Sequence, residues 1–200
     1  MLTRVAIADV VGHGEAVSDI SQFIYDALKA HMNDIAGDEL LAEVNQVAAE
    51  RGFDAITTAA VVAFYRKDNN LYFTYAGHYP AMIKRTDQQH WFNAQGDANQ
   101  NDSGGEVSNL PLAIDADTKY HQQALPLNSG DRIFLYTDGV VETPDQAGTL
   151  FGQDRLAATL AEFGSAPLVE LKASVLQRVR DHAGGRLTHD DVTLLAIEVR

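Results

Sequence analysis

The sequence predicts an α+β fold in which pairs of helices pack on the faces of a β-sheet. Three observations lead to this prediction. Short apolar runs with strand character fill the middle of the chain, segments of helical periodicity lie near each end, and 46% of the 200 residues are apolar. That apolar content is enough for the core of one domain. We find no internal repeat and no domain boundary, so residues 1–200 are expected to form a single domain.

The N-terminal part is expected to contain a strand followed by two helices. Residues 5–11 are apolar except for Asp9, which is typical of a buried strand. From residue 18 to residue 32 the apolar side chains recur at helical spacing, and Ser18 is the expected N-cap. A second periodic segment covers residues 40–48. Each helix would bury one face against a flat surface, which a sheet would supply.

The rest of the chain alternates between strand-like runs and a further helical pair. Residues 56–65 are rich in β-branched side chains and lead through a polar turn at 67–70 into a strand at 71–75. Further strands are expected at 81–84, 89–92, 120–125, 132–137 and 192–199, and helices at 154–163 and 167–182. Residues 94–109 are polar and without periodicity, so they are expected to form a surface loop, or alternatively a lid.

Composition excludes several classes of function. The net charge is −13, and no basic stripe is present to neutralise nucleic-acid phosphates or to bind an anionic membrane. The absence of cysteine excludes disulfides, a thiolate nucleophile and a zinc–thiolate site. No apolar stretch is long enough to insert in a membrane, and the first residues do not form a signal peptide. These features predict a cytoplasmic protein.

Several aspartates stand beside strand-like runs at widely separated points of the sequence. Asp9 and Asp138 each end such a run, and Asp190 and Asp191 open one. A carboxylate in this position is costly to bury unless it is paired or bound to a metal. If folding brings the four together, their oxygens suit Mg²⁺ or Mn²⁺. The pattern therefore predicts metal-assisted hydrolysis.

Each of these residues also has a simpler interpretation. Asp138 followed by Gly139 is common in turns, and Asp190-Asp191 is compatible with a solvated strand start or an N-cap. Asp9 is harder to explain in this way, because it follows a fully apolar strand.

Other residues near these aspartates leave two interpretations open. Gly12 and Gly14 would permit a tight turn and a close approach of strand and helix, or serve only as turn residues. A histidine such as His13 suits general acid chemistry, but a structural or surface role is preferred for it. His78 is expected in a turn. His189 is expected beside the metal ligands, while Thr193 would support the ligands or cap its strand.

The ordered set of short motifs is similar to one known family. The motifs are Asp9-Val10-Val11-Gly12-His13-Gly14, Thr57-Thr58-Ala59-Ala60, Ala76-Gly77-His78-Tyr79-Pro80, Leu110-Pro111-Leu112-Ala113-Ile114, Leu135-Tyr136-Thr137-Asp138-Gly139-Val140-Val141-Glu142 and His189-Asp190-Asp191-Val192-Thr193. Together they resemble the metal-dependent Ser/Thr protein phosphatases of the PPM family, also called type 2C. The branch is that of the bacterial stage II sporulation protein E and its stress-response relatives.

The resemblance implies an antiparallel β-sandwich flanked by helical pairs, in four layers ordered α-β-β-α. It also implies a centre of two metal ions, Mn²⁺ or Mg²⁺. In family terms Asp9 would bridge both ions and the carbonyl of Val10 would help to hold one of them. Asp138, Asp190 and Asp191 would bind the other, with Asp190 the better candidate for direct ligation. Asp9, Asp138 and Asp190 are thus the expected catalytic residues.

The implied activity is hydrolysis of phosphoserine and phosphothreonine. A water molecule bridging two divalent cations ~4 Å apart becomes hydroxide near neutral pH, so no protein nucleophile is required. The implied substrate is a signalling phosphoprotein of the anti-sigma-factor-antagonist type in a partner-switching circuit. An upstream sensor or receiver partner is also implied.

The start of the chain departs from the family pattern. Relatives carry an earlier strand whose acidic residue joins the metal centre, whereas none of residues 1–8 is acidic. Three explanations compete: an N-terminally incomplete domain lacking its first strand, a start placed too far downstream, or a divergent and weakened enzyme. A missing strand would leave ladder groups unpaired, which favours the first explanation. Ala113, where relatives often carry glycine, is a smaller departure.

Two other functions remain open at this stage. The protein could be a pseudophosphatase that binds a phosphoprotein or another partner without turnover, as the missing acidic strand suggests. It could also be a metallohydrolase that acts on small phosphoesters. Metal titration tests the first alternative, and a comparison of a phosphopeptide with an aryl phosphate tests the second.

Overall fold

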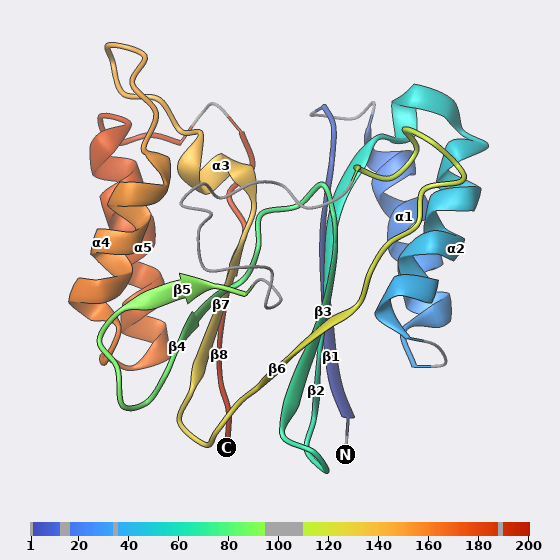
Figure 1. Ribbon diagram of the computed structural model, residues 1–200. Coiled ribbons are helices and arrows are strands. Elements are labelled where there is room, and N and C mark those ends of the chain that lie inside the picture. The colour runs from blue at the N-terminus through green and yellow to red at the C-terminus, as the bar shows by residue number, and fades with distance from the viewer. Residues whose placement is uncertain (1, 13–16, 34–35, 95–109, 188–189) are drawn as a thin grey trace. The chain divides into compact units, whose positions relative to one another are not determined.

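The computed structural model describes residues 2–12, 17–33, 36–94, 110–187 and 190–200. Two compact units can be distinguished within it. The first unit comprises Met1–Pro80 and Gln95–Pro126, and the second comprises Ala81–Ala94 and Leu127–Arg200. Each unit contains one antiparallel sheet and one pair of longer helices, which confirms the α+β prediction (Figure 1).

The sheet of the first unit has the strand order β1-β2-β3-β6. Its strands are β1 (Leu2–Val10), β2 (Thr57–Tyr65), β3 (Asn70–Ala76) and β6 (Gln123–Pro126). The turn between β2 and β3 contains Asn69 at φ 55°, a left-handed conformation that asparagine adopts more readily than most residues. All pairings are antiparallel.

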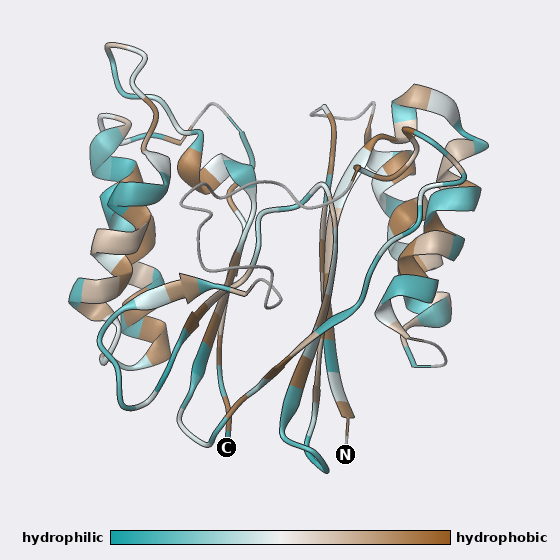
Figure 2. Cartoon of the chain, in the orientation of Figure 1, coloured by the Kyte–Doolittle hydropathy of each residue, from teal (hydrophilic) through white to brown (hydrophobic). Residues whose placement is uncertain are grey.

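Helices α1 (Ser18–His31) and α2 (Gly37–Ala49) cover one face of this sheet (Figure 1). Their buried side chains join residues of β1 and β2 in one core cluster, in which Leu40, Leu41 and Val44 are fully buried. Burial of one such side chain contributes roughly 1.5–3 kcal/mol relative to leaving it exposed. In Figure 2 the brown, hydrophobic stripes of both helices lie toward the sheet and teal residues lie outward.

Ser18 is not the N-cap predicted from the sequence. Val17 occupies that position, and Ser18 is already the first helical residue. The cap of α1 makes no side-chain hydrogen bond, because valine has no side-chain acceptor. The apolar periodicity located the helix correctly. The preference of serine for the N-cap position placed the start of the helix one residue too late.

The sheet of the second unit has the strand order β5-β4-β7-β8. Its strands are β4 (Met82–Lys84), β5 (Trp91–Asn93), β7 (Arg132–Tyr136) and β8 (Leu194–Glu198). Helices α4 (Gly152–Phe163) and α5 (Leu168–His182) pack together beside this sheet (Figure 1). The indole N–H of Trp91 donates a 2.8 Å hydrogen bond to the carbonyl of Leu160 and thereby ties β5 to α4.

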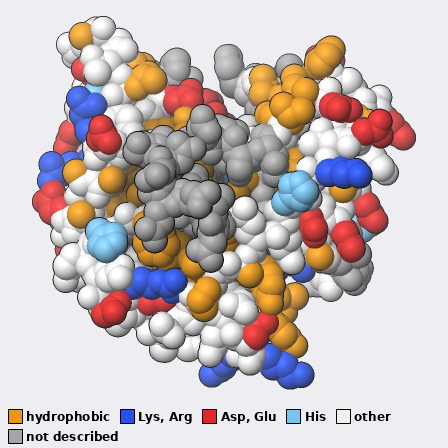
Figure 3. All heavy atoms as spheres, in the orientation of Figure 1, with side chains coloured by type: hydrophobic (Ala, Val, Ile, Leu, Met, Phe, Trp, Pro, Cys, Tyr) orange, Lys and Arg blue, Asp and Glu red, His pale blue; other side chains and the backbone are white. Residues whose placement is uncertain are grey.

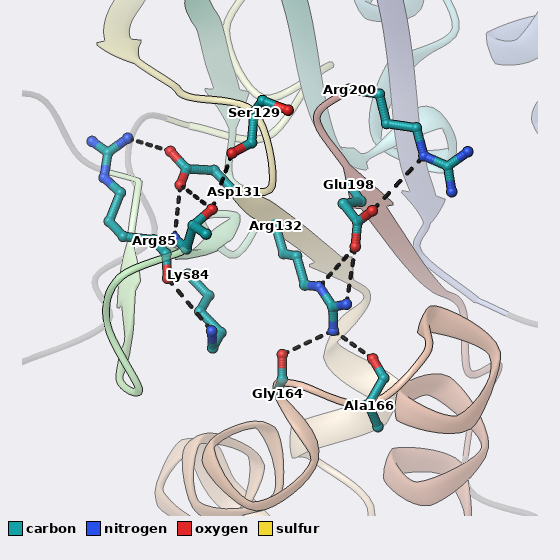
Figure 4. Close-up of polar contacts among 10 residues, drawn as sticks. Lys84, Arg85, Ser129, Asp131, Arg132, Gly164, Ala166, Glu198 and Arg200 are labelled. Atoms are coloured by element: carbon teal, nitrogen blue, oxygen red, sulfur yellow. Dashed lines mark hydrogen bonds and ion pairs between the residues drawn. The ribbon is translucent and has the colours of Figure 1, made fainter.

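Two polar contacts lock the strand connections of the second unit (Figure 4). The Asp131 carboxylate, only 1% exposed, accepts hydrogen bonds from the Arg85 side chain and from the backbone N–H groups of Thr86 and Asn128. Arg132 pairs with Glu198 at 2.9 Å and also donates to the backbone carbonyls at the end of α4. Asp131 and Arg132 therefore have structural roles, because each forms hydrogen bonds or ion pairs with other residues of the second unit.

Two short elements were not predicted. The 3-10 helix η2 (Gly52–Ala55) precedes β2, and α3 (Asp138–Val141) follows β7 where the sequence indicated only a turn. Neither is long enough to produce a periodic apolar pattern. The remaining predicted strands and helices are present, with ends shifted by a few residues. The polar segment 94–109 lies outside the described residues except for Ala94, which is buried.

Candidate metal centre

Asp9 and Val10 are the last residues of β1 in the first unit. In the antiparallel register Asp9 stands opposite Thr58 and Val10 opposite Thr57. Ala8 and Val10 pack against the helical core cluster. Because side chains alternate along a strand, Asp9 lies on the other face of the sheet, away from α1 and α2.

Gly12 redirects the chain directly after β1. Its φ is +110°, and a β-carbon there would lie 2.9 Å from the side chain of Val17. Both observations require glycine, in agreement with the predicted turn and close approach. The N–H of Val11 donates to the carbonyl of Ile56 at 2.9 Å, so the chain beyond Asp9 remains hydrogen-bonded to the segment before β2.

His78 is a buried residue with a long-range partner, rather than only a turn residue. It is 2% exposed, and its Nδ1 atom lies 2.9 Å from Oγ1 of Thr58. The neighbouring Gly77 bridges to Ala59 in β2 and packs against Pro111, which leaves no space for a β-carbon. Thr58 and His78 stand in two of the motifs found in the sequence. Their contact was not predicted, because the two motifs are distant along the chain.

Asp138 begins α3 in the second unit. Its Oδ1 accepts a 2.8 Å hydrogen bond from the N–H of Gly139, and its backbone carbonyl accepts one from Glu142. Among the described residues, Oδ2 has no hydrogen-bond partner. One carboxylate oxygen is therefore fixed by the helix start, and the other is available to a ligand.

Asp190 and Asp191 lie beside Asp138 because β8 pairs with β7. The hydroxyl of Thr137 donates to the carbonyl of Asp191 at 3.3 Å and accepts from the N–H of Thr193 at 3.1 Å. The N–H of Thr137 donates to the carbonyl of Thr193 at 3.1 Å. Thr193 thus supports the acidic pair through its backbone, and Thr137 is a supporting residue that the sequence analysis missed.

The close approach is tightest at Gly139. A β-carbon at this position would overlap the backbone carbonyl of Asp191 and lie 3.6 Å from Cβ of Asp190. The glycine of the Asp138-Gly139 pair is therefore required by packing against the other acidic segment. This contact indicates more than turn chemistry and favours the interpretation of these aspartates as one group.

The donor atoms suit a divalent cation, although the described residues contain no preformed cluster. All candidate ligands are carboxylate or carbonyl oxygens, which Mg²⁺ and Mn²⁺ prefer. Across the described ranges, no three His, Asp or Glu side chains form a group ready to hold a metal ion. Asp138, Asp190 and Asp191 belong to the second unit, and Asp9 and Val10 belong to the first. His13, Gly14 and His189 lie outside the described residues.

Exposed apolar side chains stand near the end of β1 in the first unit. Val11 is 59% exposed and Phe53 75%, and Leu110 and Ile114 are exposed as well. Their segments are joined by backbone hydrogen bonds, from Val11 to Ile56 and between Thr57 and Leu112. Figure 3 shows hydrophobic side chains gathered at the upper end of this unit. We call Val11, Phe53, Leu110 and Ile114 the apolar rim.

The sequence profile described as stage II sporulation protein E (SpoIIE) matches residues 2–200. The chain belongs to this family. Among curated relatives, it is 28% identical over 197 residues to the phosphoserine phosphatase RsbU of Bacillus subtilis, and the match covers 97% of the chain and 55% of RsbU. It is 28% identical over 131 residues to protein IcfG of Synechocystis, covering 65% of the chain and 18% of IcfG. The chain thus spans about half or less of these relatives.

Solved structures share the fold. The RsbU and RsbW domains of Rv1364c from Mycobacterium tuberculosis match with a TM-score of 0.81 at 23% identity, covering 100% of the chain and 52% of that structure. RsbX in complex with magnesium matches with a TM-score of 0.65 at 15% identity, covering 98% and 80%. At these identities the likeness establishes the fold alone. Within the described part of this family member, no helix is long and apolar enough to cross a membrane.

Proposed function

We propose that this domain hydrolyses phosphoserine and phosphothreonine on a signalling phosphoprotein in a metal-dependent reaction. The observation that carries the proposal is the approach of Asp138 to the Asp190-Asp191 pair, enforced by the Gly139 contact and the Thr137 hydroxyl. Membership in the stage II sporulation protein E family supports the same conclusion. RsbU, a phosphoserine phosphatase by name, is a relative.

In this proposal Asp9 and the carbonyl of Val10 would hold divalent cations together with Asp138, Asp190 and Asp191. Bound Mn²⁺ or Mg²⁺, two ions by family resemblance, would neutralise the phosphoryl oxygens and increase the acidity of the attacking water. The backbone hydrogen bonds to Asp138 and Asp190 orient these carboxylates before any ligand binds. Such preorganisation lowers the cost of assembling the charged site.

The apolar rim supports a protein substrate over a small phosphoester. Its side chains are exposed, and Val11 directly follows the proposed ligand Val10. A phosphoprotein can bury such side chains when it binds, whereas a small phosphate ester is too small to cover them. By family resemblance, the substrate would be an anti-sigma-factor antagonist, and regulation would come from an upstream sensor or receiver partner.

The direct test is hydrolysis of a phosphoserine peptide with Mn²⁺, repeated after addition of excess chelator. The proposal predicts turnover that chelator abolishes, with a phosphoprotein preferred over an aryl phosphate in kcat/KM. Turnover that persists in chelator would exclude the metal-dependent reaction. A preference for the aryl phosphate would instead assign the domain to small phosphoesters.

A second candidate is a pseudophosphatase that binds a phosphoprotein without turnover. Measured Mn²⁺ binding separates the two functions. A folded domain that binds phosphoprotein but neither binds Mn²⁺ nor turns over would be a binding module.

A further inference from the structure

The Thr58–His78 contact is a built feature that the proposed reaction does not yet use. Two distant motifs supply it, and the 2.9 Å separation of Thr58 Oγ1 and His78 Nδ1 is a full hydrogen bond. His78 is 2% exposed, so its ring is held by the surrounding packing. The turn alone does not explain why His78 is buried and hydrogen-bonded to the hydroxyl of a residue in β2.

The register places this pair next to Asp9. Thr58 is the cross-strand partner of Asp9. Directly opposite residues in an antiparallel pair project to the same face, with their Cβ atoms about 4.5–5.5 Å apart. Thr58, Asp9 and the ring nitrogen that contacts Thr58 therefore share the sheet face opposite α1 and α2.

The donor and acceptor groups define what the Thr58–His78 pair would have to do in order to serve Asp9. An ionised carboxylate only accepts, so a hydroxyl that serves Asp9 must donate its single proton to that carboxylate. Thr58 Oγ1 must then accept from His78, which requires the proton of the ring to be on Nδ1. A role of this pair in orienting Asp9 would require the order His78 N–H to Thr58 O–H to Asp9.

We infer that Thr58 and His78 are positioning residues that orient the Asp9 carboxylate for metal binding. This inference rests on the proposed function. It assigns a role to the Thr57-Thr58 and Gly77-His78 motifs, which the sequence singled out without one. Outer-shell partners of this kind typically change metal affinity or activity by roughly 10–100-fold when they are removed.

The test is Mn²⁺ binding, measured by the electron paramagnetic resonance signal of free Mn²⁺, on purified variants whose folding is verified by thermal unfolding. Thr58→Val, which keeps the β-branched shape but removes the hydroxyl, is expected to weaken binding by roughly 10–100-fold. Thr58→Ser, which restores the hydroxyl, is expected to retain affinity near that of the wild type. His78→Asn retains an N–H donor near the Nδ1 position and is expected to bind more tightly than His78→Phe.

A matched control removes a hydroxyl elsewhere in the same sheet. Thr74 in β3 is 1% exposed, and its hydroxyl has no hydrogen-bond partner among the described residues. Thr74→Val is therefore expected to leave Mn²⁺ binding unchanged. Because His78 acts through Thr58, adding His78→Phe to Thr58→Val is expected to weaken binding no further. A merely structural role would instead give two independent losses.

The outcomes separate this inference from the proposed function. If Thr58→Val binds Mn²⁺ as tightly as the wild type while Asp9→Asn has lost binding, the positioning role is wrong and the metal centre stands. If the folded wild-type domain binds no Mn²⁺, the proposed function fails, and the positioning role fails with it.

Discussion

Gly139 and Asp191 approach each other so closely that no β-carbon fits between position 139 and the Asp191 carbonyl. This contact joins the two acidic segments of the second unit, one at the start of α3 and the other before β8. It makes the geometry of the acidic group depend on the absence of a single side chain.

Gly139→Ala is expected to displace the Asp190-Asp191 segment, since the atoms in its way are backbone. Metal-dependent turnover should fall by roughly 10–100-fold, as for other losses of ligand support. Gly148→Ala is the control, because Gly148 has a positive φ but nothing within 4 Å of a β-carbon. Its backbone strain should lower thermal stability while leaving kcat/KM unchanged. Unchanged turnover in Gly139→Ala would contradict the packing argument.

Asp131→Asn tests the polar network of the second unit by its dependence on pH. Burial alone would raise the pKa of Asp131, but hydrogen bonds from Asn128, Arg85 and Thr86 outweigh it and hold the pKa below 3.8. The ionised carboxylate therefore contributes stability that is fully present above pH 3.8 and is lost as the pH falls through the lower folded-state value.

Chemical denaturation at several pH values measures this contribution. At neutral pH, Asp131→Asn should lower the free energy of unfolding by about 2 kcal/mol or more, because charged hydrogen bonds are lost. The difference from the wild type should shrink below pH 3.8. The exposed residue Asp117 provides the control, because Asp117→Asn should leave the free energy of unfolding almost unchanged. If the difference in the free energy of unfolding between Asp131→Asn and the wild type stayed constant down to the pH of acid unfolding, the role of Asp131 would be refuted.

Ala113 adopts φ 67°, a conformation that costs a non-glycine residue about 1–2 kcal/mol. Its N–H donates to the buried Asn45 side chain, which also donates to the carbonyl of Asp115. Ala113→Gly should relieve the strain and raise the free energy of unfolding by about 0.5–1 kcal/mol, since the flexibility of glycine offsets part of the gain. Ala116→Gly, at a residue without positive φ, should destabilise instead. Denaturant unfolding of both variants checks the sign.

Phe53→Ala tests the apolar rim. Phe53 is 75% exposed, so its truncation should change thermal stability little. KM for a phosphoprotein substrate should rise while kcat/KM for an aryl phosphate stays the same, because only the protein covers the rim. Val169→Ala, at an equally exposed residue of α5, should alter neither constant. An equal effect of Phe53→Ala on both substrates would exclude a role of the rim in substrate binding.

The sequence predicted the elements that have a repeating apolar pattern. Strand β1 was located by a continuous apolar run, and helix α2 by apolar residues at helical spacing. Helix α3 was missed because only Asp138–Val141 form it. Its first residue, Asp138, is a proposed metal ligand, so an element of only four residues carries part of the proposed site.

The supporting contacts of the site were less accessible from sequence. The hydroxyl of Thr137 reaches Asp191, and His78 reaches Thr58, across separations of 54 and 20 residues respectively. Local patterns do not encode such contacts, since strand register determines them. The run Gly77-His78-Tyr79-Pro80 indicated a turn correctly, but the burial of His78 depends on β2. The acidic residues were singled out from the sequence because carboxylates beside apolar strands require a compensating partner, and their role as metal ligands stays a prediction.

Asp9 is proposed to belong to a metal centre that hydrolyses phosphoserine. The most direct test compares the wild type with Asp9→Asn in hydrolysis of a phosphoserine peptide over a Mn²⁺ titration. Asparagine preserves the size of the side chain but removes its charge. We expect turnover to fall by more than the roughly 10–100-fold typical of outer-shell changes, with no recovery at high Mn²⁺. Metal-dependent turnover by Asp9→Asn equal to that of the wild type would contradict the account.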